Sequence, residues 1–441
     1  MKISKYTFCL EWDDGDFYLF NTLSNALIQI DEETFGIIKQ AQAHNVNLNG
    51  QELDVDLWQV LKEKTFITEN DKDDFLIYKS MIMPLRNQKK FMHLTLAPTM
   101  ECNFRCFYCF ESEKPKGKMS SEVMDAIVKY ISSLPELKKI YLTWFGGEPL
   151  LAVPQMELFY EKLRAVYDKD IDSNIITTGF HLTKDIIPVL QKLQISSVQI
   201  TLDGNKERHN KIKHTSECED VFSKVLKNID DLTRKVPPME VIFRINITKE
   251  NAQEYIPLYH YLYDRFGGKN ISVAPGFVAD RTNTGKKNYF FKREEITRFI
   301  LDLWNSHHIY TPWLRYPKAI CSECAIRDQR AISFDSEGYV YKCWEMIGMR
   351  KHAIGKINGS GEITNINRVL LNRQLYGADP IDDHKCQECA YLPICDGGCP
   401  IQRIQNEYEN ANNDVCTTHI NNLKDFIRIH VALTKDGFDN H

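Results

Sequence analysis

The stretch Cys102-Asn103-Phe104-Arg105-Cys106-Phe107-Tyr108-Cys109 carries three cysteines in the spacing C-x3-C-x2-C. Thiolates bind zinc, copper(I) and iron–sulfur clusters. A structural zinc site or an ordinary four-iron cluster takes four protein ligands, and this stretch supplies three, with no other cysteine close to it in the sequence. We therefore expect a 4Fe-4S cluster bound through three of its irons, with the fourth iron open to a small molecule. A zinc loop or a disulfide-bonded hairpin is the alternative.

The residues around these cysteines favour the cluster. Residues 91–96 alternate in polarity and run into Ala97-Pro98-Thr99, which predicts a strand that feeds the cysteine loop. Phe104, Phe107, Tyr108 and Phe110 would surround the thiolates with apolar bulk. A dry shell limits solvent access to a cluster and tunes its potential.

A strand followed by C-x3-C-x2-C, with aromatic Tyr108 before the last cysteine, resembles the signature of radical S-adenosylmethionine (SAM) enzymes. The resemblance implies that Cys102, Cys106 and Cys109 hold the cluster and that Tyr108 belongs to the cofactor site. It also implies that SAM chelates the open iron and is cleaved to methionine and a 5′-deoxyadenosyl radical.

Composition limits the class of protein. The chain has 441 residues, 43% apolar and 26% charged, with a net charge of −5, which predicts two or three globular domains and no nucleic-acid partner. We find neither a long apolar run nor a signal-peptide core, so we expect no membrane association and a cytoplasmic location. The thirteen cysteines then favour metal binding over disulfides, and oxygen-sensitive clusters suggest an anaerobic or microaerobic host.

Residues 1–85 are expected to form a separate module. Strands are predicted near residues 6–10, 17–20 and 26–30, followed by a helix capped by Asp31 and a second helix through Leu57 and Leu61. This order suggests a winged-helix-like module, similar to the modules of radical peptide maturases that bind a leader peptide by strand addition. A packing extension of the barrel is the alternative. Cys9 is expected to be a buried apolar residue.

Residues 86–305 alternate strand and helix signals, which indicates a parallel α/β sheet. Further strands are expected near residues 140–145, 175–180, 197–202, 241–247 and 271–275, and six strands suggest the partial (β/α)6 TIM-like barrel of the family. The second strand ends in Gly146-Gly147-Glu148-Pro149, at the strand end where barrels place their sites. This run resembles the family's GGEP motif, which implies contact with the amino group of SAM.

Polar residues follow the next strands. Thr178 stands where the family's Thr-Asn-Gly turn has Asn, and Thr201 and Asp203 lie in a segment that resembles its Ser-Leu-Asp-Gly. Arg244 alternates with buried positions, and a guanidinium pointing inward suits the methionyl carboxylate of SAM. An internal salt-bridge network of Thr201, Asp203 and Arg244 is the alternative. Cys218 is expected to be incidental.

Residues 306–441 have a different character. A hairpin over residues 334–341 leads to Cys343, and periodic structure is otherwise sparse, so metal sites are expected to replace much of the core. The segment resembles the SPASM extension, which binds two auxiliary 4Fe-4S clusters. The resemblance implies three clusters in the chain, an inner auxiliary one on Cys321, Cys324, Cys343 and Cys399 and an outer one on Cys386, Cys389, Cys395 and Cys416. Two zinc knuckles are the alternative.

These features lead to three functional hypotheses. The first is a maturase that oxidatively cross-links a ribosomally made peptide, with auxiliary clusters as electron acceptors and a small flavodoxin- or ferredoxin-type electron donor. The second is an anaerobic sulfatase maturase that forms formylglycine. That class has an Asp base after the cysteine corresponding to Cys343, where this chain has Trp344 and then Glu345. Strand alternation would turn Glu345 away, so it is a weak base candidate. The third is a zinc-binding, non-catalytic scaffold.

Overall fold

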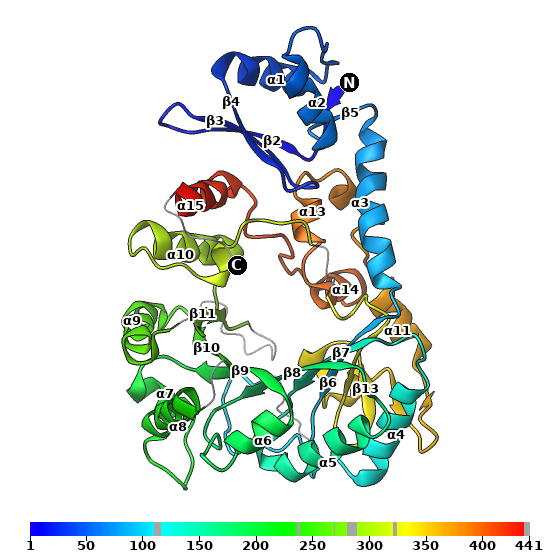
Figure 1. Cartoon of the computed structure of the whole chain (residues 1–441), viewed down its shortest axis with the longest axis vertical. Helices are drawn as coiled ribbons and strands as arrows, with labels where there is room; N and C mark the ends of the chain where they lie inside the picture. The colour runs from blue at the N-terminus through cyan, green and yellow to red at the C-terminus, as the bar shows by residue number, and fades with distance from the viewer. Residues whose placement is uncertain (110–115, 236–238, 269, 280–288, 321–323, 436–441) are drawn as a thin grey trace. The chain divides into compact units, whose positions relative to one another are not determined.

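The computed structural model describes residues 1–441 apart from 110–115, 236–238, 269, 280–288, 321–323 and 436–441 (Figure 1). The chain forms two compact units. The first unit combines Met1–Asn87, Arg293–Asp328 and Tyr376–His441, and the second combines Gln88–Lys292 and Gln329–Leu375. The expected division at residues 1–85, 86–305 and 306–441 stays a prediction, because this grouping by contacts joins the N-terminal segment to most of the cysteine-rich segment.

The second unit contains a ten-stranded mixed sheet in the order β11-β10-β9-β8-β7-β6-β12-β13-β14-β15. Strands β6 to β11 pair in parallel, β12 joins β6 in parallel, and β13 to β15 add antiparallel pairs. Five of the six parallel strands lie where they were predicted, and β8 begins five residues earlier than its predicted range and ends three residues earlier, which still confirms the α/β class. The bounds are β6 Phe91–Leu96, β7 Lys139–Trp144, β8 Asp170–Thr177, β9 Ile195–Leu202, β10 Glu240–Ile247, β11 Ile271–Phe277, β12 Ala331–Phe334, β13 Tyr339–Tyr341, β14 Gly355–Ile357 and β15 Ile363–Thr364.

Helices connect the parallel strands and lie along the outer side of the sheet (Figure 1). Ser120 caps the first of them by accepting from the Val123 N–H, and Met124, Ile127 and Ile131 form its buried stripe. Burial of alternate residues on each strand gives the sheet one face toward these helices. The helices are α4 Ser121–Ser132, α5 Val153–Arg164, α6 Ile187–Lys192, α7 Lys206–Ile212, α8 Val221–Lys235, α9 Tyr255–Phe266 and α11 Arg368–Leu375.

The first unit begins with the predicted three strands, β2 Thr7–Glu11, β3 Phe17–Asn21 and β4 Leu27–Ile30, which form an antiparallel sheet in that order. Asp31 accepts from the Thr34 N–H at 2.8 Å, so the predicted cap of the next helix is confirmed. A second small sheet pairs β1 Lys2–Ile3 with β5 Ile67–Thr68. The likeness to a winged-helix module stays a prediction.

The expectation of sparse periodic structure near the C-terminus is wrong. Amphipathic helices α14 and α15 bury Ile401, Ile404, Phe426 and Ile427, so the segment has apolar packing as well as cysteines. Helix α3 was not predicted either. The helices of this unit are α1 Glu32–His44, α2 Val55–Glu63, α3 Asp71–Arg86, α10 Arg293–Asn305, α12 His384–Gln387, α13 Leu392–Cys395, α14 Pro400–Tyr408 and α15 Leu423–Lys435.

The N-terminal segment and the C-terminal segment share a core within the first unit. Phe20 and Tyr18 pack in one cluster with Ile394 and Ile427. The buried Tyr78 hydroxyl on α3 donates to Asp396 at 2.7 Å. The cysteine-rich segment is therefore held by contacts far apart in the sequence. No helix in the described ranges is long and apolar enough to cross a membrane.

Candidate active site

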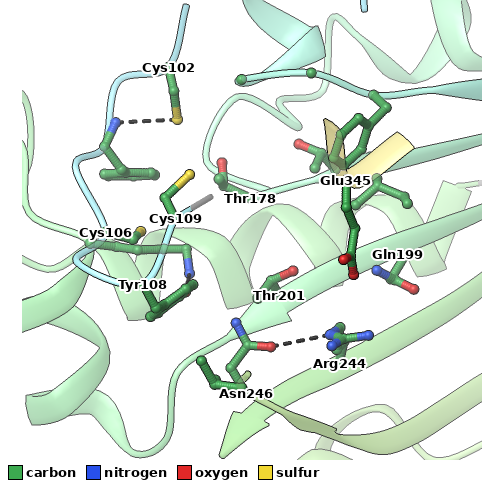
Figure 2. Close-up of a pocket in the computed structure, with 18 of the residues that line it drawn as sticks. Cys102, Cys106, Tyr108, Cys109, Thr178, Gln199, Thr201, Arg244, Asn246 and Glu345 are labelled. Atoms are coloured by element: carbon green, nitrogen blue, oxygen red, sulfur yellow. Dashed lines mark hydrogen bonds between the residues drawn. The ribbon is translucent and has the colours of Figure 1, made fainter. Parts of the chain in front are cut away.

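One pocket of about 260 Å³ in the second unit is lined by all three cysteines of the C-x3-C-x2-C loop. The loop follows β6, and the rest of the wall comes from the carboxyl ends of β7 to β11 and from the turn after β13. Figure 2 shows Cys102, Cys106 and Cys109 at one side of this pocket, facing Thr178 and Thr201. Parallel strands bring their carboxyl ends to one edge, so the fold gathers residues from distant parts of the sequence there.

The Gly146-Gly147 turn lies directly on the backbone that leads into the cysteine loop. The Gly147 N–H donates to the Thr99 carbonyl at 3.2 Å, and the Glu148 N–H donates to the Glu101 carbonyl at 2.8 Å. A Cβ at Gly146 would lie 2.4 Å from the Thr99 oxygen, and one at Gly147 would lie 2.2 Å from the Glu101 oxygen. The glycines are therefore needed because two loops meet there, and both also line the pocket.

Glu148 is fully buried and lies behind the pocket wall. Its carboxylate accepts from the Leu150 N–H at 3.0 Å, the Thr177 hydroxyl at 2.7 Å, and the Thr178 N–H and hydroxyl at 2.8 and 2.5 Å. The side chain thus fixes the turn to the end of β8. The predicted contact of this motif with the amino group of SAM stays a prediction, and the structure adds a scaffold role for the carboxylate. Pro149 is likewise buried and opens a short 3-10 turn over Pro149–Ala152.

Asp203 is also behind the wall, in a buried polar network. It accepts from the Tyr108 hydroxyl of the cysteine loop and forms an ion pair with Lys213. The Asn246 amide donates to the same carboxylate at 3.3 Å and accepts from Arg244 Nε at 3.2 Å. Burial alone would raise the pKa of Asp203, but the Lys213 cation together with the hydrogen bonds from Lys213 and Tyr108 and the other neighbouring charges lowers it. The network ties the cysteine loop to β9 and β10.

Arg244 and Glu345 bring opposite charges to the pocket. Figure 2 shows the Glu345 carboxylate pointing into it, toward Gln199 and Arg244. Burial lowers the pKa of Arg244, and the charge of Glu345 opposes this shift. The expectation that strand alternation turns Glu345 away is wrong, because β13 ends at Tyr341 and residues Trp344–Met346 form a 3-10 turn.

Trp344 also reaches the pocket. Its ring meets Phe145 edge to face, with centroids 5.0 Å apart, just before the glycine turn. Trp344 therefore occupies the position, directly after Cys343, where sulfatase maturases are expected to have an Asp, and its indole forms part of the pocket wall.

The structure places nine of the predicted site residues on the pocket wall: Cys102, Cys106, Cys109, Tyr108, Gly146, Gly147, Thr201, Arg244 and Glu345. Glu148, Pro149 and Asp203 support that wall from behind. Sequence reasoning missed Gln199, Asn246 and Lys213, which also line it. Alternation along the strands indicates the first two, since Gln199 precedes Thr201 by two positions and Asn246 follows Arg244 by two. Lys213 follows α7 and carries no comparable signal.

The donor set fits a three-thiolate cluster. Thiolates, a close glycine backbone and a partly buried guanidinium suit an iron–sulfur cluster with a chelating ligand that has a carboxylate. Within the described part of the chain, no three His, Cys, Asp or Glu side chains converge on a single metal ion. A cluster does not need such convergence, because each thiolate binds a different iron.

The outer set of C-terminal cysteines approaches one another within the first unit. Cys416 and Cys386 both act electrostatically on Cys395, and Cys389 acts on Cys416. Burial raises the pKa of Cys395 to about 12 and that of Cys386 to about 11, so these thiols stay protonated until a metal displaces the proton. A Cβ at Gly398 would lie 1.8 Å from the Val415 oxygen, so this glycine lets the Cys395 and Cys416 segments meet.

The predicted inner set is divided between the units. Cys324 and Cys399 belong to the first unit, where Cys399 acts electrostatically on Cys324, and Cys343 belongs to the second. Cys321 lies outside the described residues. Both auxiliary ligand sets stay predictions.

Three thiols at the carboxyl edge of a parallel α/β sheet, beside a Gly-Gly turn, define a radical SAM site. The family model of the radical SAM superfamily matches residues 96–262, and the chain contains this domain and is an enzyme. A radical SAM domain binds a 4Fe-4S cluster and SAM. The non-catalytic scaffold hypothesis is thereby wrong.

Similarity to other proteins extends beyond the radical SAM domain. The chain is 24% identical over 333 residues to a serine-type anaerobic sulfatase-maturating enzyme of Klebsiella pneumoniae, covering 70% of this chain and 81% of that one. It is 21% identical to the radical SAM cyclopropyl synthase TigE of Paramaledivibacter caminithermalis, covering 93% and 91%. Its fold is similar to that of Streptococcus suis SuiB bound to precursor peptide SuiA, with a TM-score of 0.53, 15% identity, and 94% and 99% coverage.

Proposed function

We propose that this enzyme oxidatively modifies a ribosomally synthesised peptide, forming a thioether or another side-chain cross-link. The observation that carries the proposal is the pocket wall after Cys343, where the Trp344 indole stands next to the inward-facing Glu345. The share of the chain that is covered by its relatives also supports a peptide-modifying function. SuiB and TigE match nearly the whole chain, whereas the sulfatase-maturating relative matches a shorter part.

When bound, the cluster and SAM supply the electron and the carbon radical that takes a hydrogen atom from the substrate. Arg244 would hold the methionyl carboxylate of SAM bidentately. Glu345 would accept the proton that leaves the substrate as the new bond forms. The remaining electron would pass to an auxiliary cluster, for which Cys386, Cys389, Cys395 and Cys416 are the outer ligands and Cys321, Cys324, Cys343 and Cys399 the inner ones.

The small sheet of the first unit is the proposed leader-binding surface. β2 and β4 are its edges, and the Thr7 carbonyl on β2 already accepts from Gln42 at 2.8 Å. A leader would therefore add to β4, since main-chain groups of an open edge pair with an extended peptide. A small flavodoxin- or ferredoxin-type electron donor and a cytoplasmic location stay predictions.

A second candidate function is sulfatase maturation. Glu345 faces the pocket and could serve as the base one position after the expected Asp, which removes the geometric objection made from the sequence.

Anaerobic co-expression with the short peptides encoded beside the gene tests the proposal. We expect a loss of two hydrogen atoms per modification by intact mass, no reaction with hydroxylamine, and no change with Cys106→Ala. Serine-type formylglycine formation also removes two hydrogen atoms, so the carbonyl probe is decisive. A hydroxylamine-reactive product, or an aldehyde formed only on a sulfatase peptide, would replace the first function by the second.

A Glu345→Gln variant tests the proposed base, and Glu337→Gln, on the β12–β13 turn outside the pocket, is its matched control. We expect SAM cleavage to continue in Glu345→Gln and peptide product to fall by about 10²–10⁴-fold, because a general base contributes that much. Unchanged product formation would remove Glu345 from the mechanism.

A further inference from the structure

Lys213 is a buried cation on the pocket wall that the proposed chemistry does not use. It follows α7 and is 2% exposed. Its ammonium group forms an ion pair with Asp203 and lies 3.4 Å from the Tyr108 oxygen. Burial acts to lower the pKa of Lys213, but its ion pair and hydrogen bond with Asp203 act in the opposite direction, and the pKa lies above its usual value. Lys213 therefore keeps its charge at neutral pH.

Only one of the two charges in the ion pair between Lys213 and Asp203 reaches the pocket. Lys213 lines the pocket, whereas Asp203 does not. The cation of the pair therefore shares the pocket wall with the cysteines, and the carboxylate that balances it does not.

The positive charge of Lys213 acts on the neighbouring side chains. Lys213 and Cys106 line the same pocket, and the Lys213 ammonium acts electrostatically on Cys106. Burial and then Lys213 lower the pKa of His209 to about 3, so His209 is neutral and adds no second cation there. His209 Nδ1 accepts from the Asp203 N–H at 3.3 Å.

We propose that Lys213 is a positioning residue that raises the reduction potential of the cluster held by Cys102, Cys106 and Cys109. One-electron reduction adds a negative charge to a centre that already has three thiolates. A fixed cation in a site shielded from water stabilises the reduced state more than the oxidised state. The electron comes from a reductant such as dithionite, and Lys213 neither gains nor loses a proton. This inference needs no peptide and so stands apart from the proposed function.

The test is an anaerobic redox titration followed by electron paramagnetic resonance, using the signal that changes when SAM is added. Lys213→Gln removes the charge, Lys213→Arg keeps it, and the double variant D203N/K213Q restores a neutral hydrogen-bonding pair. Lys211→Gln is the matched control, because Lys211 is an exposed cation two residues away on α7. Iron and sulfide are counted in every variant.

We expect Lys213→Gln and D203N/K213Q both to lose at least about tenfold in the ratio of reduced to oxidised cluster at a fixed potential, a shift of about 59 mV for a one-electron couple. Lys213→Arg and Lys211→Gln should titrate like the parent.

A double variant that titrates like the parent would overturn the inference, because support of Asp203 and Tyr108 would then be the only role of Lys213. Loss of the cluster from both uncharged variants would overturn it too, since it would also assign Lys213 a structural role. Because the readout needs no substrate, a failed peptide assay and a failed charge effect remain distinguishable.

Discussion

The three-cysteine loop and the C-terminal cysteines show two ways of building a thiolate site. Cys102, Cys106 and Cys109 lie on one loop after one strand, and the strand ends of the sheet complete their pocket. Cys386 lies in α12, Cys395 ends α13, Cys389 lies between these helices, and Cys416 lies in the segment before α15. In the same unit, strands β2 and β3 pack against α13 and α15, and Tyr78 of α3 donates to Asp396.

Because of this difference, we expect substitutions to affect the two cysteine sites in different ways. The loop depends on backbone contacts with the neighbouring strand's turn, such as Gly147 lying against Glu101. The C-terminal set depends on pairs more than 290 residues apart, such as Arg86 with Asp379. We therefore expect substitutions near the loop to act on chemistry and substitutions in the first unit to act on folding.

The largest effect should come from Cys106→Ala. One of three cluster ligands is lost, and the two remaining thiolates cannot hold a cluster with one open iron. We expect no SAM cleavage and a loss of about four irons per chain, measured by chromatography of 5′-deoxyadenosine and by iron counting. Cys218→Ala is the control, since Cys218 lies outside the pocket. Cleavage at the parental rate in Cys106→Ala would contradict the assignment.

Cys395→Ala should show whether the three-cysteine loop and the C-terminal cysteines act independently. If the outer set holds an auxiliary cluster, this variant loses about four irons but keeps the loop site intact. We expect SAM cleavage to persist while peptide modification falls to background, because the substrate electron has no acceptor. Equal loss of both activities would show that the two regions are not independent. Unchanged iron would remove Cys395 as a ligand.

The loop site was more predictable from sequence than the C-terminal site, for a physical reason. Local spacing fixes which side chains share a loop, and the strand ends near Gly146, Thr201 and Arg244 follow from strand periodicity. Burial of carboxylates is not encoded locally. Glu148 and Asp203 were assigned to the cofactor from their position, which stays a prediction, and their buried hydrogen bonds and ion pair are visible only in the fold.

Helices α14 and α15 were missed because cysteine spacing dominated the interpretation of the C-terminal segment and masked its helical period. Cys343 shows a further limit. Sequence order placed it with the C-terminal segment, whereas β12 pairs with β6 and draws Cys343 into the second unit. Pairing between distant strands cannot be inferred from a period of two.

Arg86→Met tests the comparison of the two cysteine sites by its effect on the folding stability of the first unit. Arg86 and Asp379 form a buried ion pair, with side chains 7% and 3% exposed. Removing one partner leaves a buried charge and costs about 3–5 kcal/mol. Arg327 Nε lies 3.8 Å from the same carboxylate, so we expect the lower end of this range. Chemical denaturation followed by hydrogen exchange in the first unit measures the loss.

Lys192→Met is the control for Arg86→Met, because Lys192 pairs with Glu157 and Glu161 at a surface where such pairs contribute about 0–1 kcal/mol. Equal costs for the two variants would show that the long-range pair does not hold the first unit together. A loss confined to the second unit would have the same meaning.

The smallest effect should come from Thr178→Val, which removes one of four hydrogen bonds to Glu148. The Thr178 N–H still donates, so the cost should be about 1 kcal/mol, seen as roughly fivefold weaker SAM binding in anaerobic calorimetry. Thr178→Asn, which restores an amide donor, should recover most of this affinity. A loss above about 100-fold would mean that the hydroxyl contacts SAM itself, because a supporting hydrogen bond is too weak to account for it.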